Sequence, residues 1–335
     1  MDYIFSPSIA FVWHRSVFSL LLGASGVAAH SRLVNIVVDG VLYDGYDPKV
    51  PNNPDVLAAW GTTVTDDGWV NHEDYRGPNI VCHRDAVNAQ GYAPVQAGST
   101  VDVQWQGYPE SHKGPVLTYL ARCGDGPGAC ATANKTELEF FLVDSEGLID
   151  PDVDSDEHAS APGYWASDLF RENNSSRVVQ IPEDLAAGHY VLRQELIALH
   201  YALLPTMGGP QHYPQCVNIE VVGGGDARPA GVRATELYNW DQGVAEGEVV
   251  EADPGLEYDI SSSPLAEYTV PGPTLYSGAA TGVEQTLSTV TSSASAVPED
   301  GAVRTSVVTL RTEPEAVSGS PPVPALVTGS HCAKP

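Results

Sequence analysis

The apolar residues from position 30 to about 276 come in short runs, which turn residues separate at irregular intervals, and no long helical period is present. Such runs predict β-strands, of which the clearest are 33–38, 100–105, 138–143, 177–181, 190–198 and 216–222. Many short strands with long loops in a chain of 335 residues predict an all-β fold, an antiparallel β-sandwich of the immunoglobulin or fibronectin III type. We expect the stretches 144–163 and 226–265 to be loops or short helices on its outside.

The first residues have the pattern of an export signal. The apolar run 17–24 follows Arg15, and the small residues Val27 and Ala29 stand where a signal peptidase reads its cleavage site. We therefore expect residues 1–29 to be a signal peptide and the product to be secreted to the extracellular space. Cleavage after Ala29 would make His30 the new N-terminus.

The last part of the chain has a different composition. After Tyr276 the residues Ser, Thr, Ala, Val and Pro dominate, and no aromatic residue follows. This composition predicts a folded domain at 30–278 and a disordered tail at 279–335.

The charge of the chain restricts its partners. A formal net charge of -27 argues against nucleic acid and anionic membranes, because phosphate groups bind basic surfaces. An uncharged polymer is compatible with this charge. No stretch reaches the roughly 20 apolar residues that a transmembrane helix needs. We expect the protein to be a monomer.

Five cysteines in an exported chain predict disulfide bonds. Cys123 and Cys130 are close enough in the sequence to close one loop, whereas Cys82 and Cys216 would join distant segments. Cys332 is left over in the tail.

Three triplets have the Asn-X-Ser/Thr pattern of N-glycosylation, and they begin at Asn134, Asn173 and Asn174. Glycosylation at these asparagines would agree with secretion.

A histidine at the N-terminus can hold one metal ion through two atoms, its free α-amine and a ring nitrogen. His30 would be such a residue after cleavage, and two later segments bring candidate partners. The loop 108–115 presents His112, and the segment 211–216 brings Tyr213, which a disulfide at Cys216 would hold in place. Two imidazoles and an amine supply nitrogen donors that suit Cu(II), with zinc as the main competitor.

Six segments occur in a fixed order along the chain: His30 with VNIVVDG at 34–40, PNIVCHR at 78–84, YPESHKGPV at 108–116, YWASD at 164–168, YVLRQELIALH at 190–200 and QHYPQC at 211–216. Together they resemble the fungal lytic polysaccharide monooxygenases of auxiliary activity family 9, formerly a glycoside hydrolase family. The resemblance covers residues 30 to about 276, nearly the whole expected domain.

The resemblance implies one copper ion per chain. The amine and ring of His30 and the ring of His112 would hold the copper, with the phenol of Tyr213 on its axis. His200 and Gln211 match the family's hydrogen-bonding pair beside the metal. The resemblance also implies a disulfide between Cys82 and Cys216.

The resemblance further implies oxidative cleavage at C1 or C4 of the linkages in cellulose or another β-glucan. Such a reaction would use O2 or H2O2 and an external electron donor, either a small reductant or a redox protein. A crystalline substrate requires a flat protein face with exposed aromatic rings, for which Tyr258 and Tyr46 are the candidates.

Two other functions compete with this interpretation. A non-catalytic secreted copper-binding protein would keep the terminal histidine, but it would not need Tyr213 together with Gln211 and His200. A hydrolase would need two paired carboxylates, and with 43 acidic residues some pair is inevitable, so the acidic content does not support it.

Overall fold

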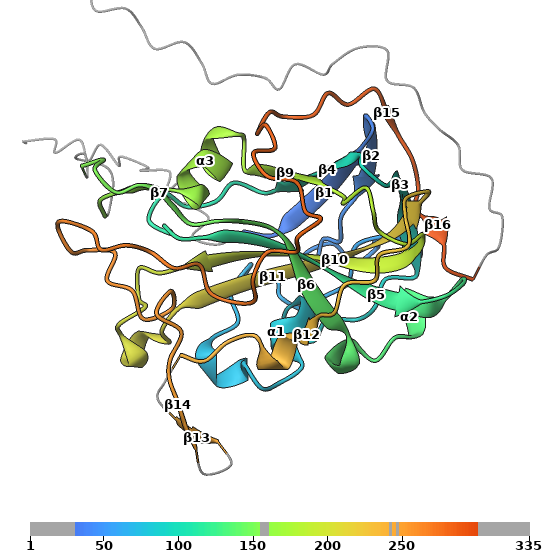
Figure 1. The fold of residues 1–335 in the computed structure, drawn as a ribbon. Helices are drawn as coiled ribbons and strands as arrows, with labels where there is room; N and C mark the ends of the chain where they lie inside the picture. Colours follow the sequence, from blue (N-terminus) through green and yellow to red (C-terminus); the bar gives the residue numbers. More distant parts are fainter. Residues whose placement is uncertain (1–30, 155–160, 241–242, 246–247, 301–335) are drawn as a thin grey trace, which may run out of the picture.

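Two β-sheets packed face to face form the body of the molecule (Figure 1). The computed structural model describes residues 31–154, 161–240, 243–245 and 248–300. Neighbouring strands are antiparallel in most pairs, and the parallel pairs among the named strands are β3 with β11 and β2 with β15. The prediction of an all-β sandwich is therefore confirmed.

The smaller sheet has five strands in the order β15-β2-β1-β4-β9. Their bounds are Leu33–Val38 for β1, Val41–Asp44 for β2, Thr100–Trp105 for β4, Ser176–Gln180 for β9 and Ser292–Ser293 for β15.

The larger sheet has seven strands in the order β12-β6-β5-β10-β11-β3-β16. The bounds are Gly91–Gln96 for β3, Val116–Gly124 for β5, Glu139–Glu146 for β6, Gly188–Ala198 for β10, Gln211–Val222 for β11, Val232–Arg233 for β12 and Val297–Pro298 for β16. Two short pairs lie outside both sheets: β7 (Leu148–Asp150) with β8 (Tyr164–Trp165), and β13 (Gly243–Ala245) with β14 (Glu248–Val250).

The described helices are all short. They are the α-helices α1 (Asn79–Cys82), α2 (Ala129–Thr132) and α3 (Ala166–Glu172) and the 3₁₀ helices η1 (His72–Asp74), η2 (Lys135–Glu137), η3 (Pro205–Met207) and η4 (Ala234–Glu236). Within the described ranges, no helix has the length and apolar character needed to cross a bilayer.

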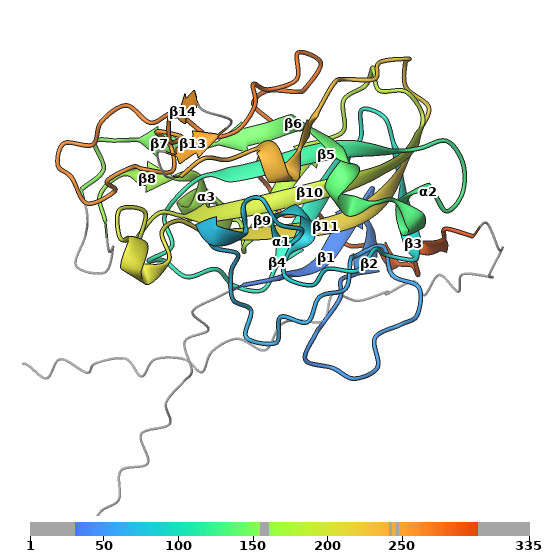
Figure 2. The same ribbon diagram turned by 90° about the horizontal axis from the view of Figure 1, so that it is seen from below.

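The larger sheet is buried on both faces. Its inner face packs on the smaller sheet, where Ile36, Val103 and Leu192 belong to one apolar cluster. Its outer face lies under α1, η4 and the long loops, where Ile80, Val191 and other buried residues form a second cluster (Figure 2). Strand β10 is accordingly buried from His189 to Ala198, and the polar side chains that it carries there are buried as well.

Strand β11 divides its side chains between these two clusters. Because successive side chains of a strand point to opposite faces, Tyr213 and Val217 lie in the inner cluster and Cys216 lies in the outer one. Gln211 therefore faces the same way as Tyr213, and His212 faces the opposite way.

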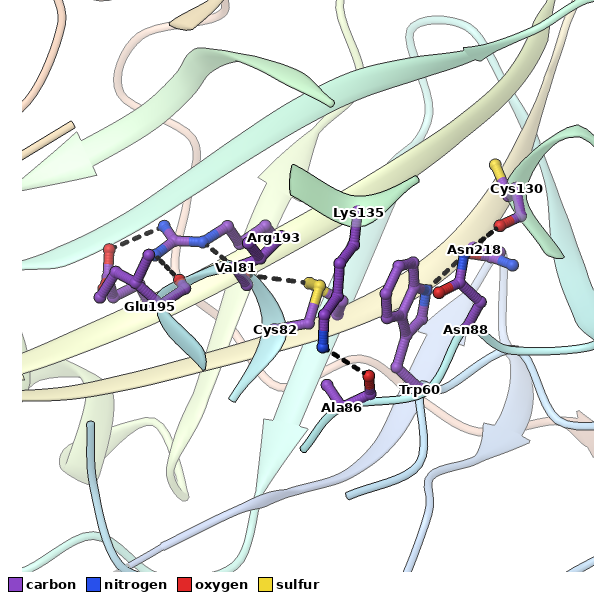
Figure 3. The surroundings of a disulfide bond; sticks show 12 residues. Trp60, Val81, Cys82, Ala86, Asn88, Cys130, Lys135, Arg193, Glu195 and Asn218 are labelled. Atoms are coloured by element: carbon purple, nitrogen blue, oxygen red, sulfur yellow. Dashed lines mark hydrogen bonds and ion pairs between the residues drawn. A yellow bond between two sulfur atoms is a disulfide. The ribbon is translucent and has the colours of Figure 1, made fainter. Parts of the chain in front are cut away.

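Two disulfides are present, as predicted. Cys82 at the end of α1 is bonded to Cys216 on β11, and Cys123 on β5 is bonded to Cys130 in α2. The first bond fastens α1 to the outer face of β11, and Figure 3 shows its surroundings.

The predicted start of the tail, residue 279, is wrong. Residues up to 300 lie against the sandwich, where β15 pairs with β2 and β16 pairs with β3. The side-chain amide of Gln285 makes both hydrogen bonds of a strand neighbour with the backbone of Val178 on β9. The carboxylate of Glu299 is buried and accepts from Asn218 and from the backbone of Gly128. The segment 277–300, which we call the strap, therefore closes the edges of both sheets; the remainder of the predicted tail lies outside the described residues.

Candidate metal centre

His112 lies on the loop between β4 and β5, and this loop is fixed at both sides. The backbone of Gly114 exchanges two hydrogen bonds with Ser167 at the start of α3, at 3.1 and 3.2 Å. On the other side, the backbone N–H of Leu199 donates to the carbonyl of Lys113 at 2.9 Å. The loop is thus held between α3 and the end of β10.

Glycine is required at position 114 because the backbone there lies very close to the backbone of Ile197. A Cβ atom at this position would lie 2.0 Å from the carbonyl oxygen of Ile197, a distance that no side chain can occupy. The glycine therefore lets the residues next to His112 pack directly on β10.

A buried ion pair also fixes the loop. Lys113 donates to the carbonyl of Gly163 at 2.7 Å and lies 3.2 Å from the carboxylate of Asp168. The same carboxylate accepts from the backbone N–H of Trp165 and so caps α3. The residue after His112 is thereby tied to the N-terminus of a helix.

Three candidate site residues from different segments meet here. The ring of His112, which is 6% exposed, lies with its centroid 4.3 Å from the ring of His200 and 6.1 Å from that of Tyr213. Tyr108 contacts both His112 and Tyr213 edge-on, at 5.7 and 5.9 Å. The structure thus brings together His112, His200 and Tyr213, and Tyr108 is a packing partner that the sequence did not single out.

Gln211 belongs to the same group. The hydroxyl of Tyr213 donates to the side-chain oxygen of Gln211 at 2.9 Å, and both side chains are buried. Burial, together with the nearby Tyr108, raises the pKa of Tyr213 well above its usual value. Tyr213 is therefore a neutral phenol at any ordinary pH.

His30 lies outside the described residues, but its neighbour Ser31 is well defined. Ser31 is buried, and its hydroxyl donates to the carbonyl of Gln106 at the start of the His112 loop. Arg32 is held by ion pairs with Asp47 and Asp67, both at 2.9 Å. The chain therefore enters the fold beside the loop that carries His112.

No group of three or more His, Cys, Asp or Glu side chains is placed to hold a metal ion among residues 31–154, 161–240, 243–245 and 248–300. Within that part of the chain His112 and Tyr213 are the predicted ligands, and the remaining donors of the predicted set belong to His30.

A buried ionic network lies on the opposite face of β11 from Tyr213. Glu195 accepts from Arg193 at 2.7 Å and from His212 at 2.8 Å, and all three side chains are fully buried. Arg193 also donates to the carbonyl of Val81 in α1 (Figure 3). A second N–H of its guanidinium donates to the carbonyl of Ile80. Burial opposes ionisation of Glu195, but the charges of Arg193 and His212 outweigh it and lower its pKa to about 2.

The two predicted aromatic face residues differ in position. Tyr258 is only 8% exposed; its ring packs against Trp165 and Tyr268, and its hydroxyl donates to the carbonyl of Ala266. Its burial in an aromatic cluster contradicts the expectation of an exposed ring on a flat face. Tyr46 is partly exposed and lines a cleft of about 320 Å³ beside Leu57 and Val87.

The predicted glycosylation sites also differ in exposure. Asn134 and Asn174 are exposed, whereas Asn173 is half-buried and its amide donates to the hydroxyl and carbonyl of Ser176. Whether these asparagines carry glycans stays a prediction.

Comparison with known proteins agrees with this geometry. The family model described as auxiliary activity family 9, formerly GH61, matches residues 30–268. The AA9 family lytic polysaccharide monooxygenase cel61A of Hypocrea jecorina is 42% identical over 83% of this chain and 74% of its own length. The AA9 family lytic polysaccharide monooxygenase B of Aspergillus fumigatus is 43% identical over 78% of this chain and 96% of its own length.

Solved structures give the same result. The extended catalytic domain of H. jecorina LPMO9A superposes with a TM-score of 0.69 at 42% identity, covering 80% of this chain and all of that domain. The family match and these relatives place the chain among oxidative enzymes of the monooxygenase class. The chain belongs to auxiliary activity family 9.

Proposed function

We propose that this chain is a secreted, copper-dependent lytic polysaccharide monooxygenase that cleaves cellulose or a related β-1,4-glucan. The observation that carries the proposal is the convergence of His112 and His200 with the hydrogen-bonded pair of Gln211 and Tyr213. A neutral glucan also suits a chain with a net charge of -27, which would repel an acidic polymer.

The donor set fits copper. The α-amine and ring of His30 and the ring of His112 would supply three nitrogen donors, which Cu(II) prefers, and the neutral phenol of Tyr213 would be a weak fourth donor. The anchoring of Ser31 beside the His112 loop supports this set, because the α-carbon of residue 30 lies only about 3.8 Å from that of Ser31.

Copper at this site would supply the one-electron chemistry that turns O2 or H2O2 and an external electron into an oxidant for C1 or C4 of the glucan. The protein's own part would be to orient the co-substrate. His200 would donate a hydrogen bond to it, and the amide of Gln211 would fix its position while held by Tyr213. These are the roles in which His200, Gln211 and Tyr213 would contribute to catalysis.

Removal of residues 1–29 is part of the proposal, because the nitrogen of His30 is an amide until the preceding bond is cut. The mature domain would then run from His30 to the end of the strap at Asp300. The pairing of β15 with β2 and of β16 with β3 supports this boundary.

The test uses the chain that begins at His30, loaded with copper and mixed with cellulose and ascorbate. We expect soluble cello-oligosaccharides oxidised at C1 or C4 by mass spectrometry. Release of only unmodified sugars, or of none from any β-glucan, would reject the proposal.

The alternative of a non-catalytic copper carrier makes a different prediction for the same sample. It would bind copper with the same affinity in titration calorimetry but release no oxidised sugar. His112→Ala should abolish tight binding in both cases, and unchanged affinity in that variant would reject His112 as a ligand.

A further inference from the structure

Ser111 and His112 are neighbours in the loop between β4 and β5, and their side chains touch. The hydroxyl oxygen of Ser111 lies 3.0 Å from Nδ1 of His112. A neutral imidazole carries one proton, either on Nδ1 or on Nε2, and a hydroxyl can accept from the protonated nitrogen or donate to the bare one. The contact is therefore compatible with two positions of the proton, which differ in their consequence for a metal.

A metal ion binds only the nitrogen without a proton. If Nδ1–H donates to Ser111, Nε2 of His112 is the bare nitrogen and can bind directly. If Ser111 donates to Nδ1, the proton lies on Nε2 and has to move before the ring can bind. Metal-binding histidines nearly always donate their other N–H to an acceptor, which fixes the proton and the ring orientation.

The position of the ring does not depend on Ser111. His112 is packed edge-on against Tyr108 and beside His200, and the ion pair of Lys113 holds the adjacent backbone. Removing the hydroxyl therefore leaves the ring in place and changes only the acceptor next to Nδ1.

We propose that Ser111 is a positioning residue that keeps the proton of neutral His112 on Nδ1 and so presents Nε2 as the metal-binding nitrogen. The inference rests on the proposed role of His112 as a copper ligand. Ser111 itself touches neither the metal nor the co-substrate in this role; it acts through the imidazole.

The first experiment needs no copper. The metal-free chain beginning at His30 is labelled with ¹⁵N at histidine, and two-bond ¹H–¹⁵N correlations are recorded at about pH 8, above the usual histidine pKa of about 6.5. The signals of His112 are assigned by their loss in His112→Ala. We expect the Nδ1–H form in the wild type and in Ser111→Thr, which keeps a hydroxyl, and a mixture of both forms in Ser111→Ala.

The second experiment measures copper affinity by titration calorimetry. We expect about twofold weaker binding in Ser111→Ala if its two proton positions are equally populated, and near wild-type binding in Ser111→Thr. Ser262→Ala is the matched control, because the hydroxyl of Ser262 donates to the carbonyl of Asp259 in a separate loop. That variant should leave both readouts unchanged.

Two outcomes overturn the inference: the Nε2–H form in the wild type, or an unchanged proton position in Ser111→Ala. A wild-type chain that binds copper but oxidises no glucan would instead contradict only the proposed function, because the proton position is measured without metal or substrate.

Discussion

His212 donates a hydrogen bond from Nδ1 to the carboxylate of Glu195 at 2.8 Å, and both side chains are fully buried. On the same imidazole, Nε2 lies 2.6 Å from the hydroxyl of Tyr75. His212 stands between Gln211 and Tyr213 in β11, so the ionic network holds the backbone that presents these two residues to the candidate metal centre.

We predict that Glu195→Gln lowers the free energy of unfolding by about 3–5 kcal/mol, because it leaves the buried guanidinium of Arg193 without its counter-ion. Urea unfolding at neutral pH measures the change. Glu257→Gln, at an exposed carboxylate, should stay within about 0.5 kcal/mol of the wild type. Equal effects of the two substitutions would contradict the role of the network.

We also predict that the loss of stability in Glu195→Gln depends on pH. The pKa of Glu195 is lowered to about 2, so its stabilising effect is present above the unfolded value of about 4.3 and is lost as pH falls toward 2. The difference in unfolding free energy between wild type and Glu195→Gln should therefore shrink over that window. A difference that stays constant down to about pH 2 would argue against the ionised form.

We predict that His83 makes the stability of the fold sensitive to acid at a higher pH than Glu195 does. Burial, with a smaller effect of the neighbouring Arg84, lowers its pKa to about 4. Its ring fits the neutral form, since Nε2 donates to the carbonyl of Gly68 and Nδ1 accepts from the N–H of Arg84, both at 2.9 Å. Between about pH 6.5 and 4 the unfolded chain binds a proton that the native protein does not bind. The free energy of unfolding therefore falls by about 3 kcal/mol by the acid end of this range.

The variant that checks this is His83→Asn, because asparagine keeps a side-chain donor and a side-chain acceptor and does not titrate. Its unfolding free energy should vary less than that of the wild type between pH 7 and about 4.5. A parallel decline in both proteins would assign the acid sensitivity to other groups.

The two disulfides should differ in their effect on stability. Cys82 and Cys216 are 134 residues apart, whereas Cys123 and Cys130 are 7 apart. In the chain-entropy model these loops correspond to about 5 and about 2 kcal/mol. Paired serine variants of each bond, compared by denaturant unfolding, should show the larger loss for the first pair, and the reverse order would contradict the prediction.

The strap should be needed for a stable sandwich. A chain that ends at Tyr276 loses β15 and β16, which opens the edges of β2 and β3, and it removes the carboxylate of Glu299 from the buried amide of Asn218. We expect a loss of about 2 kcal/mol or more and concentration-dependent aggregation. A chain that ends at Asp300 is the control and should unfold like the full chain in calorimetry and remain monomeric in light scattering.

Gln211→Leu should separate metal binding from turnover. The side chain accepts from Tyr213 and is not a predicted ligand, so copper affinity should change little while the rate of glucan oxidation falls at least about tenfold. Normal turnover in this variant would leave Gln211 as a structural residue of β11.

Several strands of the two sheets could be predicted because each contains a short apolar run that is visible in the sequence. The runs 33–38 and 100–105 match β1 and β4, and the pairing of Cys123 with Cys130 needed only sequence proximity. The other predicted strands differ at their ends by up to five residues, the largest difference being the start of β11 at Gln211 instead of Cys216. Strands β2, β3 and β5 were missed. Strand β2 is short and β5 is buried over most of its length, so neither shows a clear alternation. Strand β3 alternates in burial but contains Pro94, a residue that argues against a strand.

The strap was missed for a different reason. Many of its contacts are made by backbone groups, and the side chains of Gln285 and Glu299 fit partners more than 80 residues away. Composition averages over such single contacts, so a segment rich in Ser and Thr resembles a free tail. The expectation of an exposed ring at Tyr258 was wrong for a similar reason, because the sequence cannot distinguish a ring on a surface from one packed against Trp165.

The ionic network behind β11 left one signal in the sequence. Arg193 and Glu195 are two residues apart in a strand, between the apolar runs 190–192 and 196–198, which places both charges on the same buried face of the strand. Two charges there require partners, but nothing local identifies His212 as one of them. The tertiary fold supplies that contact.

The alternation of β11 sets a limit on how this protein can vary. Moving the strand by one position would turn His212 toward the candidate metal centre and place the phenol of Tyr213 next to Arg193 and Glu195. The disulfide at Cys216 and the backbone bonds between His212 and Val70 lock the present alignment. An insertion or deletion between Gln211 and Cys216 would therefore disrupt the candidate metal centre and the ionic network together.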